Sequence, residues 1–174
     1  MSLISLDEGR AHLRVEPDYP AEQIQPYLDG ADAAAQRFLN RNVYPDQAAL
    51  DAARAGVPAA LAAALAAREQ AQEAAGQIAD PATARLLSCA ADDAYADALE
   101  SAQHVLRGMV LTANIRVALL LLLGHLSENR ETVARGATVT DLPVGAEHFL
   151  LPDRVGWGGS VSYTHLTLPT KRIV

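Results

Sequence analysis

The stretch TANIRVALLLLLGHLSENRE, residues 112–131, contains the longest unbroken apolar run of the chain. This run, residues 117–123, is apolar on every side, and the sequence turns abruptly polar after Leu126. Either Thr112 or Asn114 can cap a helix here, since both residue types are favoured at N-caps. A helix that is apolar all round normally lies at the centre of a fold or of an assembly. The stretch therefore predicts a central helix that continues to about Glu131.

Two helices are predicted before this stretch. Ser5 and Glu8 have the spacing of a capping box, which predicts a short helix ending near Leu13. Apolar residues at helical spacing predict a second helix over residues 21–40, and a turn over residues 40–45 is expected to end it. The apolar face of the second helix consists of Ile24, Leu28, Ala31, Ala35 and Phe38.

The segment 46–107 differs in composition, because residues 48–102 hold 24 of the 35 Ala residues of the chain. Ala has the highest helix propensity but buries little area, so the segment favours helix with weak packing energy. We interpret it as an inserted helical hairpin or arm, with a loosely ordered excursion as the alternative. Three helical pieces are predicted in it: Asp46 to about Ala55, stopped by Gly56; Pro58 to about Ala75, stopped by Gly76; and a third opened by Asp80 and Pro81.

The sequence signals for secondary structure are weaker after the central helix. Residues 137–140 are β-prone but short, residues 141–143 indicate a turn, and residues 144–151 could form a last short helix ended by Pro152. Aromatic residues make up only 5% of the 174 residues, and this Ala-rich composition also favours helix. The chain is therefore predicted to be all-α, a small helical bundle with an Ala-rich helical insertion.

The charge of the chain argues against two classes of protein. It has 21 acidic and 14 basic residues, a net charge of -7, and its only Lys is Lys171. Such a chain lacks the positive surface of a non-specific DNA binder and the polybasic signal of a membrane-surface protein. The apolar run 117–123 is far shorter than the roughly 20 residues that span a bilayer, and residues 1–10 do not form a signal peptide. We expect a soluble intracellular protein or part of an assembly built inside a cell.

Residues 161–174 are expected to be foreign to the rest of the chain. The ten residues 161–170, VSYTHLTLPT, are encoded in order by a stretch of a transposase-type sequencing adapter, GTC TCT TAT ACA CAT CTG ACG CTG CCG ACG. The continuation of that adapter predicts a final Val followed by a stop, which fits Val174. We expect that the native sequence stops near Gly159 or Ser160, that 160–174 is a non-native tail, and that the true C-terminus is lost. This tail is excluded from functional reasoning.

The residues that could carry chemistry are few. The single Cys89 excludes an internal disulfide and a multi-Cys zinc site, and its Ala and Leu neighbours predict a small buried packing residue. The pairs Glu100–His104 and His125–Glu128 have helical spacing, but two ligands do not make a metal site and ordinary helix contacts are favoured. Asp92 and Asp93 are interpreted as a solvated acidic pair, and no phosphate-binding loop or nucleophile motif occurs. We predict no enzyme activity, no cofactor and no metal.

The charged cluster 128–135 allows two interpretations. It can be a solvated helix end, which is favoured on general grounds. It can also be a contact between subunits, in which Arg130 and Arg135 face carboxylates.

The two ends of the native sequence resemble the phage head–tail connector (adaptor) family. At the N-terminal end the resemblance covers ISLDE 4–8, AHLRV 11–15, YLD 27–29, AAA 33–35, FLNR 38–41 and Tyr44. At the other end it covers IR 115–116, ALLL 118–121, GH 124–125, ENRE 128–131, LP 142–143, Gly145, LL 150–151 and RV 154–155. The ordered set spans about 90 of the first 160 residues, and no single motif in it is catalytic. The resemblance implies a connector core of 1–45 and 108–159, with 46–107 as an insertion whose role it leaves open.

The resemblance also implies a function. Subunits of this family pack side by side into a homo-oligomeric ring of about a dozen copies that docks on the portal protein of a filled capsid. The ring extends the channel for double-stranded DNA, which passes without sequence-specific binding, and it is the platform for tail-completion proteins. The expected location is the head–tail interface of the virion, after assembly in the host cytoplasm, and no membrane is involved. An acidic channel would let DNA slide, because phosphates are repelled.

The expected structural and interface positions follow from this resemblance. Gly124 could permit close helix approach, and Arg130 could pair with a carboxylate of its own or of the next subunit. The full set of candidates is Gly124, His125, Glu128, Asn129, Arg130, Leu142, Pro143 and Arg154. Two alternatives remain open: another phage morphogenesis factor, such as a tail-completion protein or an assembly chaperone, and a metal-dependent hydrolase that uses His104 or His125.

Overall fold

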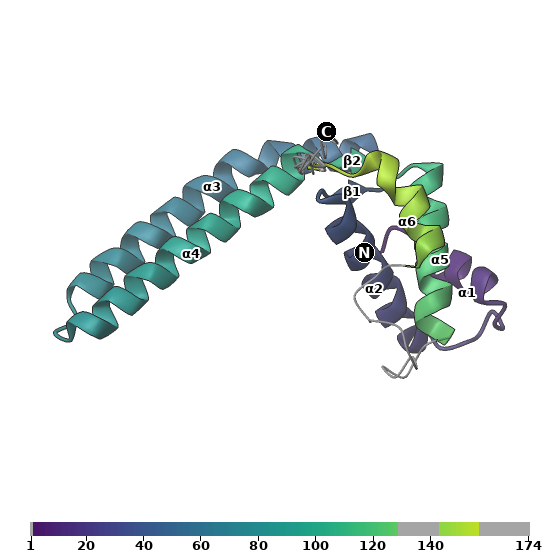
Figure 1. Ribbon diagram of the computed structural model, residues 1–174, viewed down its shortest axis with the longest axis horizontal. Helices are drawn as coiled ribbons and strands as arrows, with labels where there is room; N and C mark the ends of the chain where they lie inside the picture. Colours follow the sequence, from purple (N-terminus) through teal and green to yellow (C-terminus); the bar gives the residue numbers. More distant parts are fainter. Residues whose placement is uncertain (1, 129–142, 157–174) are drawn as a thin grey trace, which may run out of the picture.

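The computed structural model describes residues 2–128 and 143–156, and this part of the chain is all-α, as predicted (Figure 1). Two short strands accompany the helices. The elements are α1 Leu6–Leu13, α2 Ala21–Leu39, β1 Val43–Tyr44, α3 Gln47–Gly76, α4 Pro81–Leu106, β2 Met109–Val110, α5 Ala113–Glu128, α6 Val144–Leu150 and a 3-10 turn Leu151–Asp153. The predicted strand-prone segment 137–140, most of the turn 141–143 and the end of the central helix at Glu131 lie outside the described residues.

The molecule has two parts that meet at an elbow. Helices α1, α2, α5 and α6 form a bundle, and α3 and α4 form a long antiparallel hairpin, the arm, which projects away from it (Figure 1). The elbow consists of β1, β2 and the adjoining ends of α3 and α4. The first and last described segments both belong to the bundle, so the arm leaves and re-enters the bundle at one place.

Helix α5 is the centre of the bundle, as its apolar sequence predicts. It packs against α1, α2 and α6, and five of its residues are buried: Ile115, Ala118, Leu119, Leu122 and Leu123. The opposing surfaces come from Ile24, Leu28, Ala31, Ala35 and Leu39 of α2 and from Ala146 and Leu150 of α6. Leu39 rather than Phe38 completes the buried face of α2, and Phe38 is only partly buried. Each fully buried Leu or Ile contributes about 1.5–3 kcal/mol, so this packing supplies most of the stability of the bundle.

Side-chain caps start four of the helices at the residues that the sequence indicates. The Oγ of Ser5 accepts from Glu8 N at 3.2 Å, and the Thr112 Oγ1 accepts from Ile115 N at 3.3 Å. The other two caps are Asp46, which accepts from Ala49 N at 2.8 Å, and Asp80, which accepts from Thr83 N at 2.9 Å. The carboxylate of Glu8 binds Arg116 of α5 at 2.9 Å, which ties α1 to the central helix.

The prediction of separate helices 46–55 and 58–75 is wrong, because α3 runs without a break from Gln47 to Gly76. Pro58 removes one backbone hydrogen bond and Gly56 adds conformational freedom, and each disfavours a helix interior. The surrounding Ala residues have the highest helix propensity, and α4 packs along the length of α3. These contributions together outweigh the two unfavourable residues, so the Ala-rich segment forms two long helices instead of three pieces.

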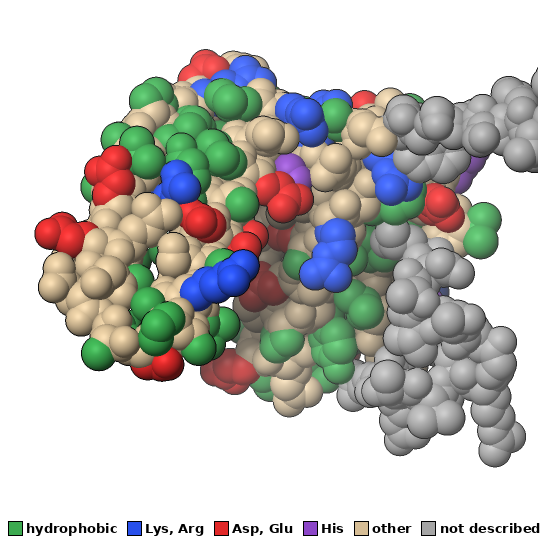
Figure 2. Space-filling view, turned by 60° about the vertical axis from the view of Figure 1, so that its left-hand side comes forward, with side chains coloured by type: hydrophobic (Ala, Val, Ile, Leu, Met, Phe, Trp, Pro, Cys, Tyr) green, Lys and Arg blue, Asp and Glu red, His purple; other side chains and the backbone are tan. Residues whose placement is uncertain are grey.

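The arm exposes more apolar surface than the sequence suggests. Cys89, predicted to be buried, is exposed, because a two-helix hairpin has only one protected seam. Large apolar side chains also remain exposed on the arm: Leu65, Leu86, Leu87 and Leu99. Figure 2 shows hydrophobic side chains gathered on this part of the molecule, with acidic side chains between them. By length and composition α3 could cross a membrane, although Ala accounts for most of its apolar character.

The elbow is closed by a strand pair that the sequence analysis did not predict. β1 and β2 pair in parallel, with Val43 opposite Met109. Backbone hydrogen bonds join Met109 N to Asn42 O at 3.0 Å and Leu111 N to Tyr44 O at 2.8 Å. Gly108 lies where this pair meets the end of α4, and a Cβ there would be 2.7 Å from Val105 O and 2.8 Å from Tyr44 Cε2. The elbow therefore depends on a glycine at position 108.

Gly108→Ala should destabilise the chain by about 1–3 kcal/mol, because the backbone and the Tyr44 ring must move apart. Gly56→Ala is the matched control, since a Cβ at Gly56 meets nothing within 4 Å. That control should stabilise the chain by up to about 1 kcal/mol, because Ala replaces Gly inside a helix. Urea unfolding followed by circular dichroism measures both. Equal stability of the two variants would contradict the close contacts assigned to the elbow.

Candidate assembly surface

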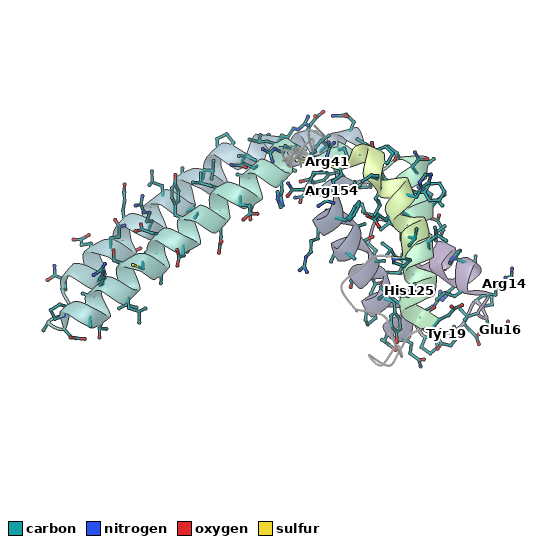
Figure 3. All side chains as sticks on the ribbon, viewed as in Figure 1. Arg14, Glu16, Tyr19, Arg41, His125 and Arg154 are labelled. Atoms are coloured by element: carbon teal, nitrogen blue, oxygen red, sulfur yellow. The ribbon has the colours of Figure 1, made fainter. Side chains whose placement is uncertain are left out.

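Three of the candidate residues lie at the end of α5. Gly124 is half-buried, and a Cβ there would make an ordinary contact of 3.5 Å with His12 Nε2 of α1, so the packing at this point does not require a glycine. His125 and Glu128 are exposed. Figure 3 places His125 at the end of the bundle far from the elbow, as it does Tyr19. Asn129 and Arg130 follow directly in sequence but lie outside the described residues.

The other described candidates lie on or after α6. Pro143 is the N-cap residue of α6, whereas Leu142 lies outside the described residues. The guanidinium of Arg154 lies over the Phe38 ring at 4.6 Å from its centroid, and Val155 N donates to Leu39 O at 2.9 Å. Arg154 is therefore fixed at the elbow, close to Arg41 in Figure 3 and far from His125. Among the candidates that lie in residues 2–128 and 143–156, the structure does not bring Arg154 together with those at the end of α5.

A different set of residues forms an apolar surface on the outside of the bundle. Val117 and Leu121 project from α5, although the opposite side of that helix forms the core. The N-terminal end of α6 lies beside them, because a Cβ at Gly145 would be 3.7 Å from Leu121 Cδ1. Val144, next to Gly145, is 82% exposed. We call Val117, Leu121 and Val144 the α5–α6 apolar surface.

This surface is a candidate for assembly, because contiguous exposed apolar side chains on a rigid element commonly mark protein interfaces. The apolar run 117–123 indicated this surface in the sequence. A bundle buries only some sides of a helix, whereas this run is apolar on every side, so part of it is left exposed. The contribution of α6 could not be predicted, because Val144 follows a Pro and has no apolar periodicity around it.

The arm carries its own polar contacts. Arg68 Nε binds Asp92 Oδ1 at 2.6 Å, and Gln72 Nε2 donates to the same oxygen at 2.8 Å. The Arg68 guanidinium also lies 5.4 Å from the centroid of the Tyr95 ring. Asp92 is thus paired with α3, but its side chain stays 48% exposed, and Asp93 is exposed as well, in agreement with a solvated acidic pair.

The geometry offers few groups for catalysis. In residues 2–128 and 143–156 no three His, Cys, Asp or Glu side chains gather where they could hold a metal ion. His104 Nε2 lies 3.9 Å from Glu100 Oε1, the helical contact expected from their spacing. The residues proposed for a hydrolase lie in different parts of the molecule, since His104 belongs to α4 of the arm and His125 to α5 of the bundle.

Asp32 is the buried charged residue of the described chain, at 8% exposure. Its Oδ2 accepts from Leu3 N at 2.8 Å, and its Oδ1 is buried without a hydrogen-bond partner. Burial raises the pKa of Asp32 above its ordinary value, although the hydrogen bond from Leu3 N acts in the opposite direction. This carboxyl holds the N-terminal segment against α2. No second catalytic group faces it among the contacts of the described residues, so we assign it a structural role.

The folded chain holds the proton of Asp32 more tightly than the unfolded chain does, so its contribution to stability is lost as pH rises through the folded pKa. Asp32→Asn should therefore raise the free energy of unfolding at neutral pH by about 1 kcal/mol, because a neutral amide replaces a buried charge. The gain should shrink as the pH falls through the folded pKa and should be lost by about pH 4, where the carboxyl is protonated in both states.

Asp29→Asn is the control, because hydrogen bonds from Gln25 and Ser2 lower the pKa of this exposed carboxyl. Replacing this carboxylate should slightly lower the free energy of unfolding at neutral pH, whereas Asp32→Asn should raise it. Urea titrations between acidic and neutral pH measure both variants, and a pH-independent difference for Asp32→Asn would contradict the assignment.

Comparisons of the chain with protein-family models, with curated proteins and with solved structures each gave no match.

Proposed function

We propose that the chain is a structural virion protein, a subunit of a phage head–tail connector ring. The observation that carries the proposal is the α5–α6 apolar surface, which is formed by the same helix that organises the core. An isolated subunit would leave this surface in water, whereas an assembly of copies would bury it. Interfaces of permanent oligomers resemble a protein core in this respect.

The order of the elements is also consistent with a connector subunit. The two sequence regions that resemble the connector family form one bundle, and the segment between them forms the arm. An arm that leaves and re-enters at a single elbow is the geometry expected of an insertion into a compact core. In the proposed ring this bundle packs side by side with its neighbours, docks on the portal protein and supports the tail-completion proteins.

The charge of the chain suits a channel through which DNA passes. With a net charge of -7, a ring of many copies has a strongly negative surface. Phosphates are repelled by such a surface, so DNA can slide through the ring without being held. This part of the proposal assigns no base-specific contact and no catalytic step to the chain.

Leu121→Glu should abolish assembly, because the new charge would be buried at the subunit interface without a partner. Leu65→Glu is the matched control, since Leu65 on the arm is 39% exposed and Leu121 is 38% exposed. Light scattering coupled to size-exclusion chromatography should give rings for the unmodified chain and for Leu65→Glu, and monomers for Leu121→Glu. Circular dichroism checks that both variants are folded.

Two results would contradict the proposal. A folded Leu121→Glu chain that still forms rings would remove the α5–α6 apolar surface from the interface. An unmodified chain that remains monomeric and forms a soluble one-to-one complex with another virion protein would favour an assembly chaperone.

A further inference from the structure

We propose that the outer part of the arm of one copy binds the elbow of a second copy. This contact rests on the proposed function, in which copies of the chain pack side by side. It joins two different surfaces of the same chain, so each copy can receive one neighbour and bind another. Such a contact would give the arm a role in the ring and would add to the α5–α6 apolar surface.

The receiving surface is the elbow patch, which consists of Leu106, Arg107, Arg54 and Arg41. Leu106 is 54% exposed at the end of α4, and the exposed Arg107 follows it. Arg54 Nη2 donates to Leu106 O at 3.2 Å and to Gly108 O at 3.1 Å. Arg41 Nη1 lies 3.5 Å from Met109 Sδ. The segment after α4 thus holds the Arg54 guanidinium beside an exposed leucine, with Arg107 next in sequence and Arg41 against Met109.

These guanidinium groups have no carboxylate partner in residues 2–128 and 143–156. The Nε atom of Arg41 is buried and donates to no acceptor. Arg54 donates to backbone carbonyls, which stabilises the end of α4 but leaves its positive charge unbalanced. The elbow patch therefore offers charged donors to the carboxylates of a partner.

The binding surface on the arm is acidic and apolar. Asp93 and Asp97 are exposed one turn apart on α4 and form no ion pair within the described chain. Asp92 differs from them, because Arg68 neutralises it. Leu86, 69% exposed, and Leu87 lie nearer the tip of the arm on the same helix. This surface is complementary in charge to the elbow patch, and each surface includes an exposed leucine.

The two surfaces lie at different positions along one helix. At roughly 100° per residue, Leu106 lies about 180° around α4 from Asp97, whereas Arg107 lies within about 80° of it. Along the helix axis, Asp93 lies about 21 Å from Arg107 at 1.5 Å per residue. A neighbour rotated about the ring axis and displaced along the arm by about this distance would bring the acidic surface of one copy against the elbow patch of the next. A second copy is favoured over DNA as the occupant, because the net charge of -7 repels phosphates.

The test uses two variants of the full chain. The elbow variant is Leu106→Glu with Arg107→Glu, and the arm variant is Asp93→Arg with Asp97→Arg. Each places like charges across the proposed contact, so each alone should self-associate at least about tenfold more weakly than the unmodified chain. An equimolar mixture should recover assembly with equal amounts of both chains, because alternating copies pair the two unaltered surfaces at one contact and the two charge-reversed surfaces at the next. Native mass spectrometry gives the composition, and circular dichroism establishes that both variants are folded.

The matched control is Glu69→Arg with Glu73→Arg, which makes the same change in charge on α3 and should leave assembly unchanged. Variants that each assemble as the unmodified chain does would overturn the arm–elbow contact while leaving the connector proposal intact. A mixture that stays dissociated would also overturn it. A third result would overturn it as well: the elbow variant assembles normally but no longer binds a short DNA duplex. The elbow patch would then contact DNA and not a second copy. If the connector proposal itself is wrong, the unmodified chain will not assemble, and this result distinguishes that failure from the ones above.

Discussion

The structure depends on the burial of α5 between α2, α6 and α1. Ile115, Leu119 and Leu123 are almost fully enclosed, and they pack against the apolar faces of α2 and α6. Helices as short as α1 and α6 are not stable alone in water, so their presence follows from this packing. The Glu8–Arg116 pair and the Asp32–Leu3 hydrogen bond then fix the N-terminal segment on the bundle. The same central helix leaves Val117 and Leu121 exposed, which connects the fold to the proposed assembly.

The arm follows a different physical principle. Its helices owe their length to the propensity of Ala and to a narrow seam between them, and their side chains bury little area. Its orientation is set at the elbow, where the β1–β2 pair and Gly108 allow α3 and α4 to join the bundle within a few residues. A stable base and a sparsely packed outer part suit an element that completes its contacts with another molecule.

Local signals made much of the fold predictable. The caps at Ser5, Asp46, Asp80 and Thr112 and the apolar run of α5 each depend on neighbouring residues, which a sequence displays directly. The continuity of α3 through Pro58, the β1–β2 pair and the Arg68–Asp92 contact depend on residues far apart in sequence, so they could not be predicted. The same limit applies to the site, because Val144 joins Leu121 only through the packing of α6 on α5. The candidates Asn129, Arg130 and Leu142 lie outside the described residues and stay predictions.

The central claim is that copies of this chain form a ring that continues the DNA channel below a portal. Electron microscopy of the unmodified chain mixed with purified portal protein tests this most directly. The account predicts rings of about a dozen copies, coaxial with the portal and open along the axis, with the arms in equivalent positions around the ring. Single copies bound to the portal, or a chain that stays monomeric beside it, would contradict the account.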